Sequence, residues 1–208
     1  MNDDKSLYDR LLEIIAVLVL AITTLGTAWC AYQASQWSGI QSDDNRTESE
    51  HRLEANRQFG LAVQTISYDT NIIAFYAQAV QAGNTGLAQF YRQSLARPGL
   101  LPILDKWQAE IAAGQSPTPL IQDQDYLSAL QSGYQSEEQQ ATATATDSQQ
   151  AGDNSSAYVK NTILLAVALF FAGVTSSFRY KPARTMLIVL ALVTLAFAAS
   201  RVADLPIA

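Results

Sequence analysis

The sequence has 208 residues, of which 49% are hydrophobic and 15% charged, with a formal net charge of −6. An acidic chain of this kind is a poor match for nucleic acid, because phosphate binding needs a basic surface. The average composition would fit a soluble domain, but apolar residues concentrate in 11–32, 162–178 and 186–202.

The first apolar run predicts a transmembrane helix over residues 11–33. A hydrocarbon core about 30 Å thick needs roughly 17 to 25 helical residues, because lipid cannot pair open backbone groups. No charge lies between Ile14 and Gln41. A removable signal peptide is the alternative, but residues 1–10 are not basic and Trp29 before Cys30 does not suit a lipoprotein site. We expect residues 1–10 to be a tail and the run to be a retained anchor.

Aromatic residues mark the point where this run would leave the hydrocarbon. Trp29, Tyr32 and Trp37 have the amphipathic rings that prefer the membrane interface, so we expect them to anchor the helix there. A lipid or ligand site is the alternative. The lone Cys30 permits no internal disulfide and is interpreted as a small apolar packing residue.

Residues 34–160 form a polar domain inserted between the first and second apolar runs. Seven Lys and Arg stand against fourteen Asp and Glu there, a formal charge of −7. Such a surface favours solubility and could attract cations. Apolar positions spaced alternately by four and three predict a coiled-coil-like seam: Phe59, Val63, Ile66, Thr70, Ile73, Ala77 and Val80.

Turn signals divide the rest of the domain into short helices. The segment 83–86, Gly-Asn-Thr-Gly, is a turn, because Gly and Asn tolerate positive φ. A helical piece over 87–97 precedes Pro98, and residues 100–113 read as an amphipathic helix. Asp123 or Asp125 can cap the last helix of the domain.

Residues 136–155 allow two interpretations. The stretch 139–150 is rich in Gln, Ala and Thr, so it is either a disordered linker or a helix of small residues that continues into the second apolar run. We favour the helix, because long loops inside compact folds are uncommon. The segment 152–154, Gly-Asp-Asn, is the expected local break.

The second and third apolar runs predict transmembrane helices over 161–178 and 185–203, joined by a tight turn at 179–184. Small residues in the second helix favour close helix association: Ala168, Ala172, Gly173 and Ser176. Their partner is either the first helix of the same chain or a second protomer.

The turn also predicts the topology. Arg179, Lys181 and Arg184 form the densest basic cluster, and such clusters stay in the cytoplasm. The domain 34–160 and the tail 204–208 are then extracytoplasmic and residues 1–10 cytoplasmic. The acidic N-terminal tail weakens this bias.

No motif indicates an enzyme, a cofactor or a metal site. The middle of each run lacks Asp, Glu, Lys, Arg and His, which proton relays and intramembrane enzymes need. His51 has no second His and no Cys cluster beside it, as a zinc site would require. Thr residues in the runs could line a pore, but single hydroxyls usually bond their own helix.

A resemblance adds to this interpretation. The segment Ala28–Gly39, which contains A-W-x-A-Y-Q-x-x-x-W, the segment Glu54–Arg57, and the segment Asn161–Gly173 resemble a group of uncharacterised bacterial membrane proteins. Arg97-Pro98 and Trp107 resemble the middle region of that group. The resemblance implies a bacterial inner-membrane protein and supplies no catalytic residues.

The sequence therefore predicts an all-α membrane protein with three transmembrane helices and an inserted extramembrane helical hairpin. The expected function is structural: an interaction or oligomerisation module, without enzymatic activity or cofactor. The expected partners are the lipid bilayer and either a second copy or another membrane protein. The alternative is a homo-oligomeric channel or transporter with an acidic outer vestibule.

Overall fold

The computed structural model describes residues 7–178 and 180–208, with side chains from residue 10 onward. About 90% of the chain is helical and the described residues contain no strand, which confirms the all-α prediction. Arg179 and residues 1–6 lie outside the described residues. Two compact units are present: one combines the chain up to Arg46 with Thr144–Ala208, and the other is Thr47–Ala143. We call them unit 1 and unit 2.

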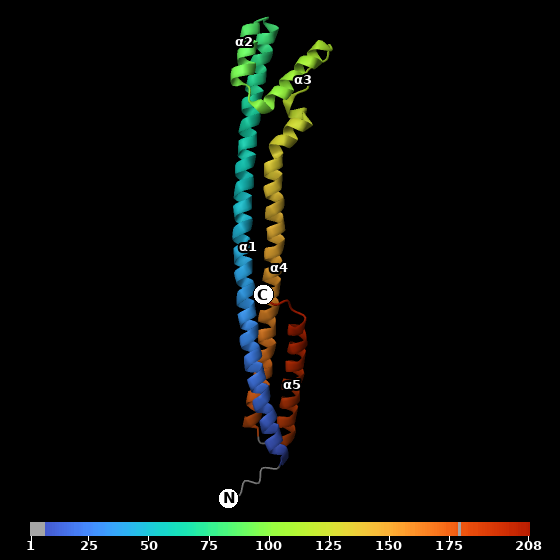
Figure 1. Ribbon diagram of the computed structural model, residues 1–208. Helices are drawn as coiled ribbons and strands as arrows, with labels where there is room; N and C mark the ends of the chain where they lie inside the picture. The colour runs from blue at the N-terminus through green and yellow to red at the C-terminus, as the bar shows by residue number, and fades with distance from the viewer. Residues whose placement is uncertain (1–6, 179) are drawn as a thin grey trace. The chain divides into compact units, whose positions relative to one another are not determined.

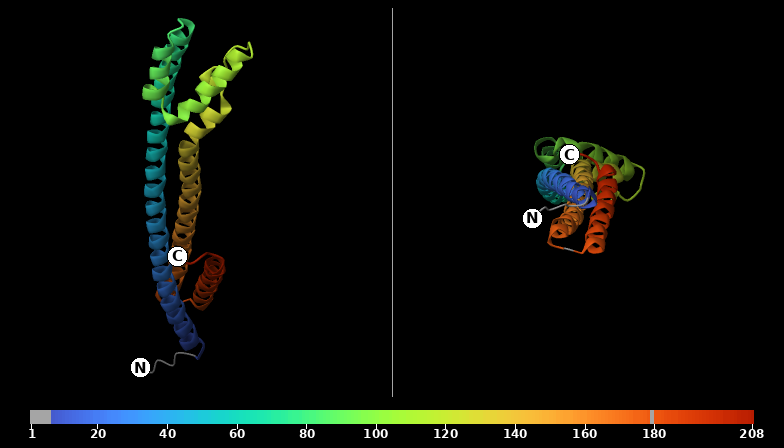
Figure 2. Two further views of the ribbon diagram at one scale, coloured as in Figure 1. Left: turned by 45° about the horizontal axis from the view of Figure 1, so that its top comes forward. Right: turned by 90° about the horizontal axis from the view of Figure 1, so that it is seen from below.

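Unit 1 is built from three helices that lie side by side (Figures 1 and 2). They are the first part of α1 (Leu7–Gln81), the last part of α4 (Gln124–Val174) and α5 (Lys181–Ala203). By length and composition, each of these three helices contains a segment able to cross a membrane. The unit includes residues 34–46 and 144–160, which the sequence interpretation assigned to the inserted domain.

Small side chains fill the inside of this bundle. Val19, Ala172 and Ala191 form one buried cluster, and Ala168 is fully buried as well. The hydroxyl of the buried Thr23 donates to the carbonyl of Val19 at 2.6 Å, so this polar side chain is satisfied within its own helix. Small residues let helix backbones approach closely, and dispersion contacts along that approach hold the bundle together.

Large apolar side chains cover the outside of the same bundle. On α1, Leu18 and Leu25 are exposed; on α4, Phe170 is exposed; and on α5, Val193 and Phe197 are exposed. A soluble bundle places its large apolar residues inside and its charges outside. In this bundle, large apolar side chains cover the outside as well.

Unit 2 contains the last part of α1 and a set of short helices (Figure 1). After α1 come α2 (Thr85–Phe90), a π-helical turn η1 (Tyr91–Leu95), η2 (Pro98–Leu100), α3 (Leu101–Ala112) and η3 (Leu120–Gln122). The turn predicted at 83–86 is present: Gly83 has a φ of 68°, and the side chain of Asn84 accepts from the backbone N–H of Leu87.

The core of unit 2 joins α1, α3 and the start of α4. Ile72 and Tyr76 of α1 pack in one buried cluster with Leu100, Leu104 and Tyr126. Of the two capping candidates, Asp123 caps α4, because its Oδ1 accepts from the backbone N–H of Tyr126 at 3.0 Å.

Helix α4 runs without interruption through residues 136–155. This confirms the helical interpretation of the Gln-Ala-Thr stretch and contradicts the break expected at 152–154. Gly152 serves a different purpose: the side-chain amide of Gln41 occupies the space that a Cβ at Gly152 would need. A glycine inside a helix costs about 1 kcal/mol relative to alanine, and here it admits a neighbouring side chain.

The connection between α4 and α5 is short. A 3-10 turn, η4 (Thr175–Ser177), ends α4, and α5 begins at Lys181 with Pro182 in its first turn, where a missing N–H costs nothing. The described residues of this connection are 175–178 and 180, so it lies earlier than the tight turn predicted at 179–184, and residues 181–184 already belong to the first turn of α5.

Candidate functional site

In unit 2, each residue on the buried face of α1 comes one position before a residue of the predicted seam. The residues turned inward are buried or half-buried and keep the alternating spacing of four and three: Gln58, Ala62, Thr65, Asp69, Ile72, Tyr76 and Ala79. One residue on an α-helix corresponds to a rotation of about 100°. Packing within the chain therefore uses the face one residue before the predicted seam, with the same periodicity.

Neighbouring side chains decide this rotation. Gln58 fits against Gly133 of α4, where a Cβ would lie 2.5 Å from the side-chain oxygen of Gln58. Further along, Asp69 is fully buried because it binds Arg97 and Tyr126. These polar contacts turn one face of α1 toward the inside of unit 2. That face carries fewer large apolar residues than the predicted seam.

The predicted seam remains largely on the surface. Phe59 is 53% exposed, Val63 49% and Val80 43%, and Thr70 is exposed too. The other three members, Ile66, Ala77 and Ile73, are half-buried or buried. Phe59 also touches the ring of Tyr134, with ring centroids 5.6 Å apart. We call these seven residues the outer stripe: an apolar row with heptad spacing in which Phe59, Val63, Thr70 and Val80 stay exposed.

An ion pair between the partly exposed Arg97 and the buried Asp69 fixes the chain after α2 to α1. Arg97 donates through Nε to Asp69 Oδ1 at 3.0 Å and through Nη2 to Oδ2 at 2.5 Å, and the Tyr126 hydroxyl donates to Oδ2 at 2.7 Å. Burial first, and then the bond to Asp69, raise the pKa of Tyr126 well above its ordinary value. The two bonds from Arg97 and the one from Tyr126 hold three segments of unit 2 together at Asp69.

A second ion pair fixes α3 to the start of α4. Lys106 donates to Asp123 Oδ2 at 2.6 Å, and this bond, with the backbone N–H of Tyr126, lowers the pKa of the Asp123 carboxyl. The indole N–H of Trp107 donates to the carbonyl of Thr118 at 2.7 Å. These contacts position the loop between α3 and α4 rather than forming a reactive centre.

The predicted membrane-interface residues divide into two groups. Trp29 and Tyr32 are 45% and 54% exposed, and their ring centroids lie 6.1 Å apart. Trp37 instead is half-buried and donates its indole N–H to the carbonyl of Pro206 at 3.1 Å. Trp37 therefore packs against the C-terminal segment in addition to lying near the other two aromatic residues in the sequence.

Sequence reasoning missed the polar contacts that hold this segment. The Tyr158 hydroxyl also donates to the carbonyl of Pro206 at 3.1 Å, and Gln33 Oε1 accepts from the backbone N–H of Ala208 at 2.9 Å. Gln33 is only 1% exposed. The available signal was a Gln at the edge of an apolar run, since buried polar side chains need partners. Cys30 is buried in the same cluster as Tyr158, which confirms its packing role.

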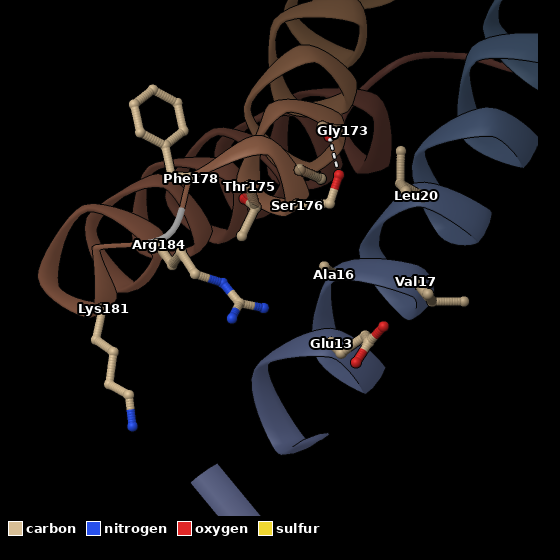
Figure 3. Close-up of a pocket in the computed structure, with 11 residues that line it drawn as sticks. Glu13, Ala16, Val17, Leu20, Gly173, Thr175, Ser176, Phe178, Lys181 and Arg184 are labelled. Atoms are coloured by element: carbon tan, nitrogen blue, oxygen red, sulfur yellow. Dashed lines mark hydrogen bonds between the residues drawn. The ribbon is translucent and has the colours of Figure 1, made fainter. Parts of the chain in front are cut away.

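The small-residue face of α4 is used within the chain. Ala168 and Ala172 are buried, and Ala172 contacts the cluster formed with Val19 of α1 and Ala191 of α5. Gly173 and Ser176 are exposed and line a cavity with Lys181 and Arg184 (Figure 3). The predicted face is thus divided between helix packing and a cavity wall.

No catalytic constellation emerges from these contacts. Among residues 7–178 and 180–208, no group of three His, Cys, Asp or Glu side chains is placed to hold a metal ion. His51 is half-buried, with Nδ1 2.7 Å from Glu137 Oε2, so it takes part in packing between helices of unit 2.

No protein-family model matches the chain, and no curated protein or solved structure is significantly similar to it. The class is therefore defined by the fold itself: an all-α protein with three helices long and apolar enough to cross a membrane, which is compatible with a multi-pass membrane protein.

Proposed function

We propose that the chain is a three-span integral protein of the bacterial inner membrane, whose extracytoplasmic unit 2 joins two copies of the chain. It acts as a structural interaction module without enzymatic activity. Two observations support this proposal: the distribution of side-chain sizes in the apolar bundle, and the exposed outer stripe on α1.

The bundle supports insertion into lipid. Its large apolar side chains face outward, where water would have to be ordered around them, and its alanines face inward. Exposed apolar area costs roughly 25 cal/mol per Å² in water, whereas hydrocarbon imposes no such cost. Helix backbones inside the bundle pair their own N–H and C=O groups, as a hydrocarbon environment requires.

Membrane insertion and topology are tested together by labelling single cysteines with a membrane-impermeant maleimide. In a Cys30→Ala background, Gln149→Cys and Tyr180→Cys place exposed thiols outside and inside, respectively. We expect intact cells with a permeabilised outer membrane to label only Gln149→Cys, and lysed cells to label both. Equal labelling in intact cells, or recovery of the chain in the supernatant after an alkaline wash, contradicts the proposal.

The outer stripe supports self-association. Bilayer insertion gives every copy the same orientation, so a given residue of α1 lies at the same height in two neighbouring copies. A two-fold axis along the membrane normal then brings the outer stripe of one copy against the outer stripe of the other. Apolar residues at heptad spacing interlock well in such a pairing. Phe59 and Val63 are the exposed large residues that gain most from it.

Disulfide cross-linking tests this pairing. Val63→Cys in the Cys30→Ala background should form a covalent dimer in oxidised membranes, because residues on a two-fold axis can bring their Cα atoms within the roughly 7 Å that a disulfide requires. Leu61→Cys is the matched control: Leu61 is 48% exposed against 49% for Val63, yet points about 160° away on the helix.

Two outcomes would overturn the dimer. One is a monomeric mass in mild detergent together with no cross-link at Phe59→Cys, Val63→Cys or Thr70→Cys. The other is cross-linking of Leu61→Cys as efficient as that of Val63→Cys, which would show collision rather than a specific interface.

A further inference from the structure

A groove lies between α1 and α5 in the apolar bundle, with a volume of about 320 Å³, within the usual size range of small-molecule sites. Three of its lining residues are buried and pack in one cluster: Cys30 of α1, Leu165 of α4 and Ala198 of α5. Gly26 lines it as well, and a Cβ there would lie 3.3 Å from the side chain of Leu165. The missing side chain at Gly26 therefore leaves the groove open while α1 packs against α4.

The lining of this groove is uncharged. Among the described residues that line it, none is an acid or a base, and the indole of Trp29 carries the one side-chain N–H. A charged or strongly polar group placed against such a lining would lose its hydration without gaining a partner, which is costly. The chemistry of the lining therefore suits hydrocarbon.

The groove is long and follows the helices. Its lining residues extend from Ile22 to Trp29 on α1 and from Leu195 to Ala203 on α5, about 10–12 Å at a helical rise of about 1.5 Å per residue. One leaflet contributes about half of the roughly 30 Å of hydrocarbon that these helices would cross. The groove thus has the direction of a lipid acyl chain and most of the depth of one leaflet.

Trp29 places one end of the groove at the membrane interface. Trp29 and its neighbour Tyr32 are exposed, and amphipathic aromatic rings prefer the headgroup level. The indole N–H of Trp29 is a donor at that level, where the polar end of a lipid lies. Ile22, at the other end, lies two helical turns deeper in the apolar run.

The walls favour a thin chain over a neighbouring helix as the occupant. Helices in a membrane approach closely where both faces carry small residues. Ala199 and Ala203 of α5 meet that requirement, but Ile22 and Trp29 on the α1 wall are large and are 55% and 45% exposed. They hold a second helix away and leave room between the walls for a single hydrocarbon chain.

We propose that this groove binds one acyl chain of a phospholipid, with the glycerol end of the lipid beside Trp29 and the end of the chain toward Ile22. Binding depends on the chain and not on the charge of the headgroup, because the lining is uncharged. The inference rests on the proposed membrane insertion and is independent of the pairing of unit 2.

Native mass spectrometry of the full chain in mild detergent tests this inference with three probes: dioleoyl phosphatidylglycerol, dioleoyl phosphatidylethanolamine and dihexanoyl phosphatidylglycerol. We expect the two dioleoyl lipids to bind within about twofold of each other. The dihexanoyl lipid should bind at least about tenfold more weakly, because each methylene removed takes away apolar burial.

Variants locate the site. Ala199→Phe and Ala203→Phe place a ring in the groove from exposed positions of its α5 wall and should each weaken binding of dioleoyl phosphatidylglycerol at least about tenfold. Ala166→Phe is the matched control: Ala166 is an exposed alanine in the apolar part of α4, next to Leu165, and is not among the lining residues. It should leave binding unchanged.

Four results would each overturn the acyl-chain site: a tenfold difference between the two dioleoyl lipids, equal binding of the dihexanoyl lipid, unchanged binding in both groove variants, or equal loss in Ala166→Phe. A disulfide-linked dimer of Ala199→Cys in the Cys30→Ala background would overturn it too, because a helix of a second copy would then fill the groove. The comparison of chain lengths on the unaltered chain decides the question even if the groove variants fail to fold.

Retention of the chain in alkaline-washed membranes is measured first. A chain that is lost from the membrane refutes the proposed function, whereas a retained chain that binds the three lipids equally refutes only this inference.

Discussion

Replacing Asp69 with Asn is expected to lower the local free energy of unfolding of unit 2 by about 2–4 kcal/mol. The Asp69 carboxylate is fully buried and accepts three hydrogen bonds, two from Arg97 and one from Tyr126. An asparagine would present an NH₂ group to at least one of these donors, so one bond becomes a donor–donor contact. The Arg97 side chain is 37% exposed and can be hydrated, which keeps the cost below that of a fully buried charge.

Hydrogen exchange of the backbone amides in α3 and at the start of α4, in the detergent-solubilised full chain, measures this effect. Asp105→Asn is the matched control, because its ion pair with Arg92 is exposed and should change the local stability by less than about 0.5 kcal/mol. If the two variants lose protection equally, the buried pair does not hold unit 2 together.

Replacing Ala191 with Phe should destabilise the apolar bundle by about 2–3 kcal/mol or more. Ala191 is fully buried against Val19 and Ala172, so a benzyl group has no space without separating the helices. Close helix approach is the main source of association within lipid, where exclusion of water contributes nothing. The midpoint of unfolding in a titration with a denaturing detergent reports the change.

Val193→Phe provides the comparison on the same helix. Val193 is 62% exposed on the outside of the bundle, where the proposed lipid environment would accommodate a ring, and the midpoint should remain nearly unchanged. Equal destabilisation by both substitutions would mean that the packing of α5 differs from the one described. A stable Ala191→Phe variant would mean that α5 is not held against α1 and α4 at this point.

Several elements follow from the sequence because the responsible physics is local. The three apolar segments are recognisable from length and hydropathy alone. Gly83 and Asn84 end α1 because their backbone and side-chain preferences act within a few residues, and Asp123 caps α4 for the same reason. The helix through 139–150 follows from Ala and Gln propensity.

Gly152 shows where local rules stop. By propensity it favours a break, but the helix continues, and the side chain of Gln41 occupies the space that a Cβ at this position would need. The contact depends on a residue more than a hundred positions away, and no local pattern contains that information.

The outer stripe shows the same limit for periodicity. The alternation of three and four was readable from Phe59 to Val80, but two adjacent faces of α1 share it, and side-chain hydropathy favoured the one that stays largely on the surface. Gly133 beside Gln58, and Arg97 beside Asp69, select the other face. A buried aspartate is costly without its partner and stable with it, so its burial could be assigned only once Arg97 was placed.

By itself, the sequence determined that the protein is helical, where its three apolar helices lie and how its turns and caps are made, since these depend on hydrophobic length and on backbone preferences over a few residues. Only the tertiary structure decided which face of α1 is buried, that Ala172 meets Val19 and Ala191, and that Lys181 and Arg184 share a cavity with Glu13. Those features arise from contacts between residues far apart in the chain, whose energies depend on distance and orientation and therefore on the folded arrangement.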